Sequence, residues 1–212
     1  KKILILGKNN LITNNIKNKL KKNKIDLFFE NERIHKNNLT LDSSLFCKKY
    51  FFKNNINFDF ILITIHFHED INNNLNSNIL LAKHVEYFSK ENSNAKIIYI
   101  SSVRAFKGNK SKYAIDKLDS ENIYSKSNNY LIIRPSTILK KENNYIYGGF
   151  RGETIMKISK FIKIFNFFPV PDDGKYQHTY CLIDCLTDFI VINLKQEIFK
   201  NEIINFFSGE YI

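Results

Sequence analysis

Short apolar runs alternate with longer amphipathic segments along the first two thirds of the chain. The runs predict strands at 2–6, 25–29, 39–41, 58–65, 95–101 and 130–135, and the segments between them predict helices ending near 22 and spanning 43–55, 74–90 and 110–126. The run FDFILITI at 58–65 is continuously apolar, which is typical of a strand buried on both faces of a parallel sheet. Strands that alternate with helices predict right-handed crossovers and a doubly wound parallel α/β sheet, whose ligands bind beyond the carboxyl ends of the strands.

The alternation weakens beyond residue 136. There the sequence predicts an amphipathic helix at 152–165, a loop at 168–175, a short strand running into a helix at 181–194, and a last strand at 202–207. We therefore expect a sheet domain over 1–136 and a smaller lobe over 137–212. The strand and helix at 181–196 are expected to pack back on the sheet domain.

Composition narrows the class of protein. Of the 212 residues 43% are hydrophobic, with 19 Phe and 11 Tyr, which is enough for a substantial core and argues against disorder. The formal net charge of +11 invites a nucleic-acid interpretation. The lysines, however, are mixed with asparagines throughout and do not cluster on one predicted element, so we expect no nucleic-acid partner.

The apolar runs, the start of the chain and the cysteines bear on the cellular compartment. No apolar run approaches the roughly 20 residues that a membrane-spanning helix needs, and a strand pattern begins at residue 2 where a leader peptide would lie. Cys47, Cys181 and Cys185 are odd in number and lack the spacing of metal ligands. The sequence thus favours a reduced, cytoplasmic protein without membrane insertion.

One pair of residues suggests chemistry. In SKYAIDKLDSE (111–121), Tyr113 lies four residues before Lys117, so both side chains would share one face of a helix. A neighbouring ammonium favours the phenolate and lowers the pKa of a tyrosine, which makes the phenol a usable acid or base near neutral pH. The same spacing also arises by chance on the surface of so lysine-rich a chain.

Several segments then occur in one order across nearly the whole chain: ILILGKNNLITNNI, LTLD, IIYISSV, YAIDKLDSE, LIIRPSTIL and FPVPDDGKYQHTYCLIDCLTDFI. Together they resemble the extended short-chain dehydrogenase/reductase family, the NAD-dependent epimerases and dehydratases of nucleotide sugars. The resemblance implies a Rossmann-like dinucleotide-binding domain over 1–136 and a reduced substrate-binding lobe over 137–212. Residues 148–175 are similar to the segment that covers the sugar in 4-keto reductases and C4 epimerases of polysaccharide precursors.

The resemblance also implies roles for individual residues. Tyr113 would exchange a proton with a sugar oxygen while hydride moves to or from the nicotinamide, Lys117 would lower the tyrosine pKa and hold the nicotinamide ribose, and Ser102 would hydrogen-bond the reacting oxygen. Ser101 is its neighbour, but strand alternation sends the two serines to opposite faces. The substrate would be a nucleotide-diphosphate sugar, and the implied substrate-binding residues are Ser102, Arg104, Arg151 and Lys175. Arg134, at a strand end, would face either the core edge or the substrate.

The implied cofactor is NAD or NADP, and the implied cofactor-binding residues are Gly7, Asn10, Leu11, Ile12, Glu30, Arg33, Asp42, Ile65, His66, Lys117 and Pro135. An acidic side chain at Glu30 would accept hydrogen bonds from the adenosine ribose and favour NAD. Arg33 would instead meet a 2′-phosphate and favour NADP, so both cofactors stay open, with a lean to NAD. His66 and His68 alternate at a strand end, but no third ligand is evident and no metal site is predicted.

The sequence departs from the family pattern in three places. The lost glycines and the early end of the chain support a second hypothesis, whereas the intact set of Ser102, Tyr113 and Lys117 argues against it. A dinucleotide-binding turn uses three glycines, whereas only Gly7 is present and Asn10 and Thr13 occupy the next two places. The loop between Ser102 and Tyr113 is short and basic. The chain ends where relatives continue, so it is expected to be either a piece of a longer protein or a reduced member. The alternative function is therefore a degenerate Rossmann protein that binds a dinucleotide or a protein partner without catalysis. A homodimer would be usual for the family.

Overall fold

The computed structural model describes residues 1–7, 10–21, 25–29, 42–43, 47, 51, 57–67, 76–91, 95–142, 145–148, 161–167, 179–196 and 201–208. Within these residues a six-stranded sheet has the order β2-β1-β3-β4-β5-β9. Its strands are β1 (Lys2–Leu6), β2 (Asp26–Phe29), β3 (Phe60–Ile63), β4 (Lys96–Ile100), β5 (Tyr130–Pro135) and β9 (Glu202–Phe206). Every neighbouring pair is parallel. The prediction of a doubly wound parallel α/β sheet is confirmed.

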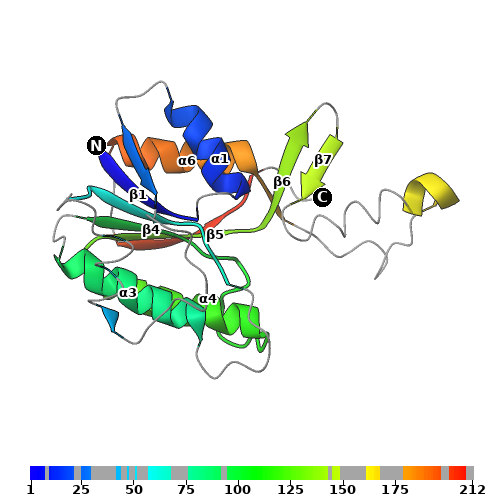
Figure 1. Ribbon diagram of the computed structural model, residues 1–212. Coiled ribbons are helices and arrows are strands. Elements are labelled where there is room, and N and C mark those ends of the chain that lie inside the picture. Colours follow the sequence, from blue (N-terminus) through cyan, green and yellow to red (C-terminus); the bar gives the residue numbers. More distant parts are fainter. Residues whose placement is uncertain are drawn as a thin grey trace.

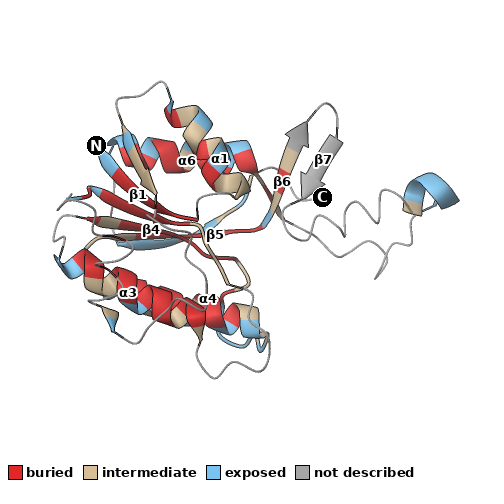
Figure 2. Cartoon of the chain, viewed as in Figure 1, coloured by how far each residue is buried: buried red, intermediate tan, exposed pale blue. Residues whose placement is uncertain are grey.

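Helices cover both faces of this sheet (Figure 1). On one face lie α1 (Leu11–Leu20) and α6 (Ile183–Gln196), and on the other lie α3 (Ser77–Glu91) and α4 (Lys112–Tyr124). Successive residues of β1 go to opposite faces: Ile3 and Ile5 join one hydrophobic cluster, whereas Leu4 and Leu6 join the other. Burial is accordingly concentrated in the strands and in the inner sides of the helices (Figure 2). This explains the continuously apolar strands of the sequence.

Most predicted elements are present, with ends shifted by a few residues. The strand predicted at 58–65 ends at Ile63, and the helix predicted at 110–126 spans Lys112–Tyr124. The strand at 202–207 and the strand-to-helix passage at 181–194 are confirmed. The strand predicted at 39–41 lies outside the described residues, and of the helix at 43–55 the structure describes Ser43 and Cys47 as helical.

A second sheet was not predicted. β6 (Thr137–Glu142) pairs antiparallel with β7 (Tyr145–Gly148) and parallel with β8 (Tyr180–Leu182). The sequences TILKKE and YIYG lack both strict alternation and a long apolar run, so the pattern did not reveal them. β8 leads directly into α6, whose Asp188 carboxylate lies 2.6 Å from Lys19 Nζ on α1. The division of the chain into domains at residue 136 stays a prediction, and β9, from beyond that point, lies in the large sheet.

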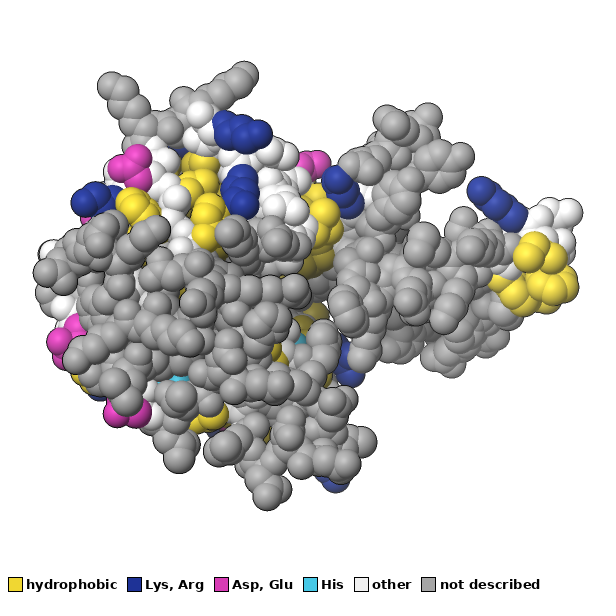
Figure 3. Space-filling view, viewed as in Figure 1, with side chains coloured by type: hydrophobic (Ala, Val, Ile, Leu, Met, Phe, Trp, Pro, Cys, Tyr) yellow, Lys and Arg dark blue, Asp and Glu magenta, His cyan; other side chains and the backbone are white. Residues whose placement is uncertain are grey.

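A helical turn at 161–165 lies at the far end of the segment beyond β7 (Figure 1). Its side chains Ile164 and Phe165, and Phe167 just after it, are more than half exposed, and the ring centroids of Phe165 and Phe167 lie 6.4 Å apart. Figure 3 shows an exposed apolar group at this end of the molecule. None of the helices in the described ranges is long and apolar enough to cross a membrane.

The core cluster beneath α3 provides a test of the fold. Phe88 is fully buried, with its ring centroid 5.2 Å from that of Phe51 and 6.0 Å from that of Phe58. We expect Phe88→Ala to lower the free energy of unfolding by about 3–5 kcal/mol, because it removes buried apolar surface and leaves a cavity. Phe106, which is 53% exposed, is the matched control: Phe106→Ala should cost less than about 0.5 kcal/mol. Denaturant unfolding measures both, and equal losses would contradict the packing described here.

Candidate active site

The polar side chains of the sheet domain gather at the carboxyl ends of the parallel strands. Residues that directly follow or end these strands are Gly7 after β1, Thr64 to His66 after β3, Ser101 and Ser102 after β4, and Arg134 and Pro135 at the end of β5. Because all the strands are parallel, these ends lie at one edge of the sheet. That edge is where open α/β sheets bind ligands.

The turn after β1 requires glycine at its first position. Gly7 has φ of +116°, a conformation that side-chain-bearing residues rarely adopt. A Cβ atom there would lie 2.3 Å from Thr64 Oγ1 and 2.8 Å from Asn10 Nδ2. The remaining glycine of the predicted dinucleotide turn is therefore fixed both by its backbone angle and by the side chains packed against it.

Asn10 caps α1. Its side-chain oxygen accepts from Thr13 N at 2.9 Å, and its Nδ2 donates to Gly7 O at 3.1 Å and to Thr64 Oγ1 at 2.7 Å. Its backbone is extended, with φ of −104°, so this position does not need the left-handed conformation that glycine or asparagine can adopt. The first N–H groups of a helix have no partner within it, and Asn10 satisfies only that of Thr13. The amides of Leu11 and Ile12 remain at the start of the helix.

Thr13 lies beneath the same turn. Its side chain is fully buried, its Oγ1 donates to Gly7 O at 2.7 Å, and it lies 2.9 Å from Thr64 Oγ1. The bulk that threonine adds at this position is thus accommodated by polar contacts between helix and sheet. Thr64 is a site residue that the sequence analysis missed. Its only signal was a hydroxyl at the end of an apolar strand.

Tyr113 and Lys117 lie on one face of α4, which begins at the N-cap Ser111. Lys117 is 4% exposed, and its Nζ donates to Ile100 O at 2.9 Å and lies 4.7 Å from the centroid of the Tyr99 ring. Burial lowers the pKa of Lys117 to about 7, and the Glu121 carboxylate opposes that shift. The amino group of Lys117 can therefore change between its ammonium and amine forms near neutral pH.

Groups from three segments surround the ring of Tyr113. The His66 ring meets it edge-on with centroids 4.8 Å apart, the Arg104 guanidinium lies 5.8 Å from its centroid, and Lys117 Nζ lies 6.0 Å away. The phenol is half-buried between the loops that follow β3 and β4. Its surroundings are rich in nitrogen donors, which favour negative charge on a bound oxygen.

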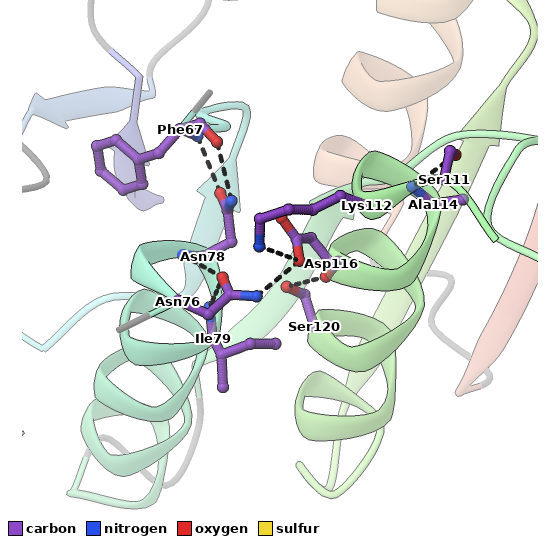
Figure 4. A network of polar contacts seen from close by, with 9 residues as sticks. All are labelled: Phe67, Asn76, Asn78, Ile79, Ser111, Lys112, Ala114, Asp116 and Ser120. Carbon is purple, nitrogen blue, oxygen red and sulfur yellow. Dashed lines mark hydrogen bonds and ion pairs between the residues drawn. The ribbon is translucent and has the colours of Figure 1, made fainter. Parts of the chain in front are cut away.

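The loop that carries His66 is held by the start of α3 (Figure 4). Asn78 Nδ2 donates to Phe67 O at 2.9 Å, and its Oδ1 accepts from Phe67 N at 2.9 Å. Asn76 Nδ2 donates to Asp116 Oδ1 at 2.6 Å, which ties α3 to α4. These two asparagines fix His66 relative to Tyr113, and in so asparagine-rich a sequence they carried no signal.

The two serines after β4 have different partners, in keeping with the alternation of the strand. Ser101 Oγ donates to the Glu121 carboxylate, and Ser102 Oγ accepts from Arg104 N at 3.2 Å. The sequence did not decide whether Arg134 faces the core edge or the substrate. Its side chain donates to the Glu121 carboxylate through Nε at 2.9 Å and through a terminal nitrogen at 2.5 Å. It therefore faces α4.

The predicted site residues divide into three groups. Those found at the carboxyl edge or on the face of α4 beside it are Gly7, Asn10, Leu11, Ile12, Ile65, His66, Ser102, Arg104, Tyr113, Lys117 and Pro135. Asp42 is exposed and precedes Ser43, whose Oγ lies 2.8 Å from His84 Nδ1 on α3. Glu30, Arg33, His68, Arg151 and Lys175 lie outside the described residues. In the described ranges no three His, Cys, Asp or Glu side chains are placed to hold a metal ion.

Comparison with known proteins supports the fold assignment. No protein-family model and no curated protein matches the chain. Among solved structures it is similar to dTDP-4-dehydrorhamnose reductase of Clostridium acetobutylicum (16% identity, TM-score 0.66, all of this chain and 75% of that one) and to UDP-N-acetylglucosamine 4-epimerase of Bacillus cereus (16%, 0.64, all and 79%). It is also similar to the Bordetella bronchiseptica enzyme WbmG in complex with NAD (10%, 0.67, all and 74%). At this identity the likeness establishes the fold alone, and the Rossmann-like fold implied by the sequence motifs is confirmed.

The polar cluster beneath the turn predicts coupled stability effects. Thr13→Val and Thr64→Val should each lower the free energy of unfolding by about 1–3 kcal/mol, because each leaves buried polar partners unpaired. The double variant should lose less than the sum, since both partners of the contact are then apolar. Denaturant unfolding of the four proteins gives the coupling energy, and strictly additive losses would show that the two hydroxyls do not interact.

Proposed function

We propose that this protein is an NAD(P)-dependent enzyme that transfers hydride to or from a nucleotide-linked sugar, as a 4-keto reductase or C4 epimerase, in surface polysaccharide synthesis. The observation that carries the proposal is the pair formed by Tyr113 and the buried ammonium of Lys117, at the carboxyl edge of a parallel sheet. Solved proteins of the same fold include a reductase and an epimerase of nucleotide sugars and an enzyme in complex with NAD.

In this function the phenol of Tyr113 gives a proton to a sugar carbonyl oxygen, or takes one from a hydroxyl. A nicotinamide whose ribose is held by Lys117 would supply or accept the hydride. Lys117 favours the phenolate through its charge, since an ammonium near a phenol stabilises the ionised form. Ser102 hydrogen-bonds the reacting oxygen. Arg104, beside the Tyr113 ring, is placed to meet an anionic part of the substrate, and Arg151 and Lys175 are proposed to bind its diphosphate.

The turn after β1 fits a dinucleotide in part. The positive end of α1 and the amides of Leu11 and Ile12 suit a pyrophosphate. The Thr13 amide, however, is already bound by the Asn10 side chain, which leaves one donor fewer. We therefore propose weak dinucleotide binding. Glu30 and Arg33 are the residues proposed to choose between NAD and NADP, so both cofactors belong in any titration, and Asp42 is proposed to lie near the adenine.

The second candidate is a Rossmann protein that binds a dinucleotide or a protein without turnover. It is favoured by the turn after β1, where the Asn10 side chain occupies the Thr13 amide. The two candidates are distinguished by turnover, which only the enzyme has. A cytoplasmic location is proposed for both candidates. Burial raises the pKa of the Cys47 and Cys181 thiols to about 12, so neither is a reactive thiolate. The homodimer stays a prediction.

Removal of one hydroxyl tests the role of Tyr113. We expect Tyr113→Phe to lower kcat by at least about 100-fold, because it deletes the proton donor and little packing, while the Kd for NAD or NADP changes less than about twofold. Reductase turnover is followed by the absorbance of reduced nicotinamide with dTDP- and UDP-linked 4-keto sugars, and epimerase turnover by the interconversion of the two C4 epimers of the linked sugar. Tyr130→Phe, at the amino end of β5, is the matched control. An unchanged kcat in Tyr113→Phe would rule out the proposed chemistry.

Burial of Lys117 predicts a pH-dependent stability. Its folded pKa of about 7 lies below the unfolded value near 10.5, so between those values the unfolded chain binds the extra proton and stability rises with pH. Lys117→Met lacks this cost. We expect the variant to be more stable than the wild type at pH 7, by on the order of a few kcal/mol, and the difference to vanish as pH approaches about 10.5.

The same variant should bind NAD or NADP more weakly, because the ribose loses a donor. Lys126→Met, at an exposed position after α4, should leave both stability and binding unchanged. Denaturant unfolding at two pH values and calorimetric titration measure these effects. Loss of stability in Lys117→Met at pH 7 would contradict the lowered pKa of Lys117. Cofactor binding equal to that of the wild type would contradict its role in holding the ribose.

A further inference from the structure

A buried ionic cluster lies directly behind Lys117. Glu121 is one helical turn beyond Lys117 on the same face of α4 and is 1% exposed. Its carboxylate accepts two hydrogen bonds from Arg134, at 2.9 Å and 2.5 Å, and one from Ser101 Oγ. The cluster therefore joins α4 to the carboxyl ends of β4 and β5, beside the strand end to which Lys117 donates.

The charged and titratable groups around Lys117 come from several elements. On α4 they are Tyr113 before it and Glu121 after it, β4 contributes Tyr99, and β5 contributes Arg134 behind Glu121. Arg104 and His66 lie against the Tyr113 ring. Asp116, also on α4, is bound by Asn76, the residue before α3, and by Lys112. In the part of the chain that the structure describes, Glu121 is the carboxylate whose charge acts on Lys117.

Glu121 thus lies between two cations, and they compete for its charge. A fork of two guanidinium hydrogen bonds to a carboxylate is among the strongest polar contacts in proteins, and it takes up much of the negative charge that would otherwise favour the ammonium of Lys117. Removal of Glu121 and removal of Arg134 should therefore have opposite effects on Lys117. If the cluster only stabilised the fold, removal of either residue would change the protonation of Lys117 in the same direction.

We propose that Glu121 and Arg134, together with Ser101, are positioning residues that set the charge of Lys117, with Glu121 favouring the ammonium form and Arg134 opposing it. The cluster thereby keeps the group beside Tyr113 able to change its protonation in the working pH range. The consequence for turnover rests on the function proposed above. The effect on the proton equilibrium of Lys117 does not, because it needs neither cofactor nor substrate.

The test is a titration of Lys117 in the full chain, with isotope-labelled lysine followed by NMR and the signal assigned by its absence from Lys117→Met. We expect Glu121→Gln to lower the midpoint by about one pH unit or more, because an opposite charge is lost. We expect Arg134→Gln to raise the midpoint by a similar amount, because Glu121 then acts on Lys117 alone. Arg134→Lys, which keeps the charge, should lie between Arg134→Gln and the wild type.

Shifts of the same sign in Glu121→Gln and Arg134→Gln, or no shift in either, would overturn the proposal. Ser101→Ala keeps every charge and removes one donor to the carboxylate, so it serves if a charge variant fails to fold. It should raise the midpoint by a smaller amount, and an unmoved midpoint there also overturns the proposal. If the proposed function holds, the pH dependence of kcat shifts in the same directions. Opposite NMR shifts in a protein without turnover would support the proposal that Glu121 and Arg134 set the charge of Lys117, and they would reject the proposed enzymatic function.

Discussion

Burial of the central sheet on both faces is the constraint from which the site follows. β1, β3, β4 and β5 run between two helical layers, and almost all of their residues are buried. Polar side chains within such strands would be costly to bury without partners. They therefore lie where the strands end, and parallel strands bring those ends to one edge. The candidate site lies at the carboxyl edge, and helices cover both faces of the sheet.

The same burial changes the charge equilibrium of the polar groups at that edge. Lys117 enters from α4 beneath the end of β4 and loses most of its hydration, which a backbone carbonyl, the face of Tyr99 and the Glu121 carboxylate replace only in part. Glu121 in turn is buried and is bound by Arg134 and Ser101. Each buried polar group needs the next as its partner, since an unpaired buried charge is strongly destabilising. The near-neutral pKa of Lys117 is thus a consequence of packing as well as of sequence spacing.

The parts of the structure that the sequence predicted are those governed by local pattern. The apolar runs of β1, β3 and β4 and the four-residue spacing of Tyr113 and Lys117 need no knowledge of distant residues. The contacts that build the site join distant positions: Thr13 meets Thr64 across 51 residues and Asn76 meets Asp116 across 40. One sequence gives no signal for such pairs. The β6–β7 hairpin was missed for a different reason, because its strands lack the period-two pattern.

The turn after β1 shows which of its positions need glycine and which do not. Gly7 cannot be replaced without a clash, whereas Asn10 and Thr13 hold places where glycine is usual because their side chains hydrogen-bond to Gly7 O and to Thr64. The fold is therefore preserved by satisfying the turn's polar groups, and one amide that would bind phosphate is used internally. Under the proposed function, a dinucleotide is held weakly at this end, so its nicotinamide end contributes a larger share of the binding. Lys117 is the residue proposed to hold that end, and Glu121 and Arg134 are proposed to set its charge, so the proposed role of the buried cluster bears directly on cofactor binding.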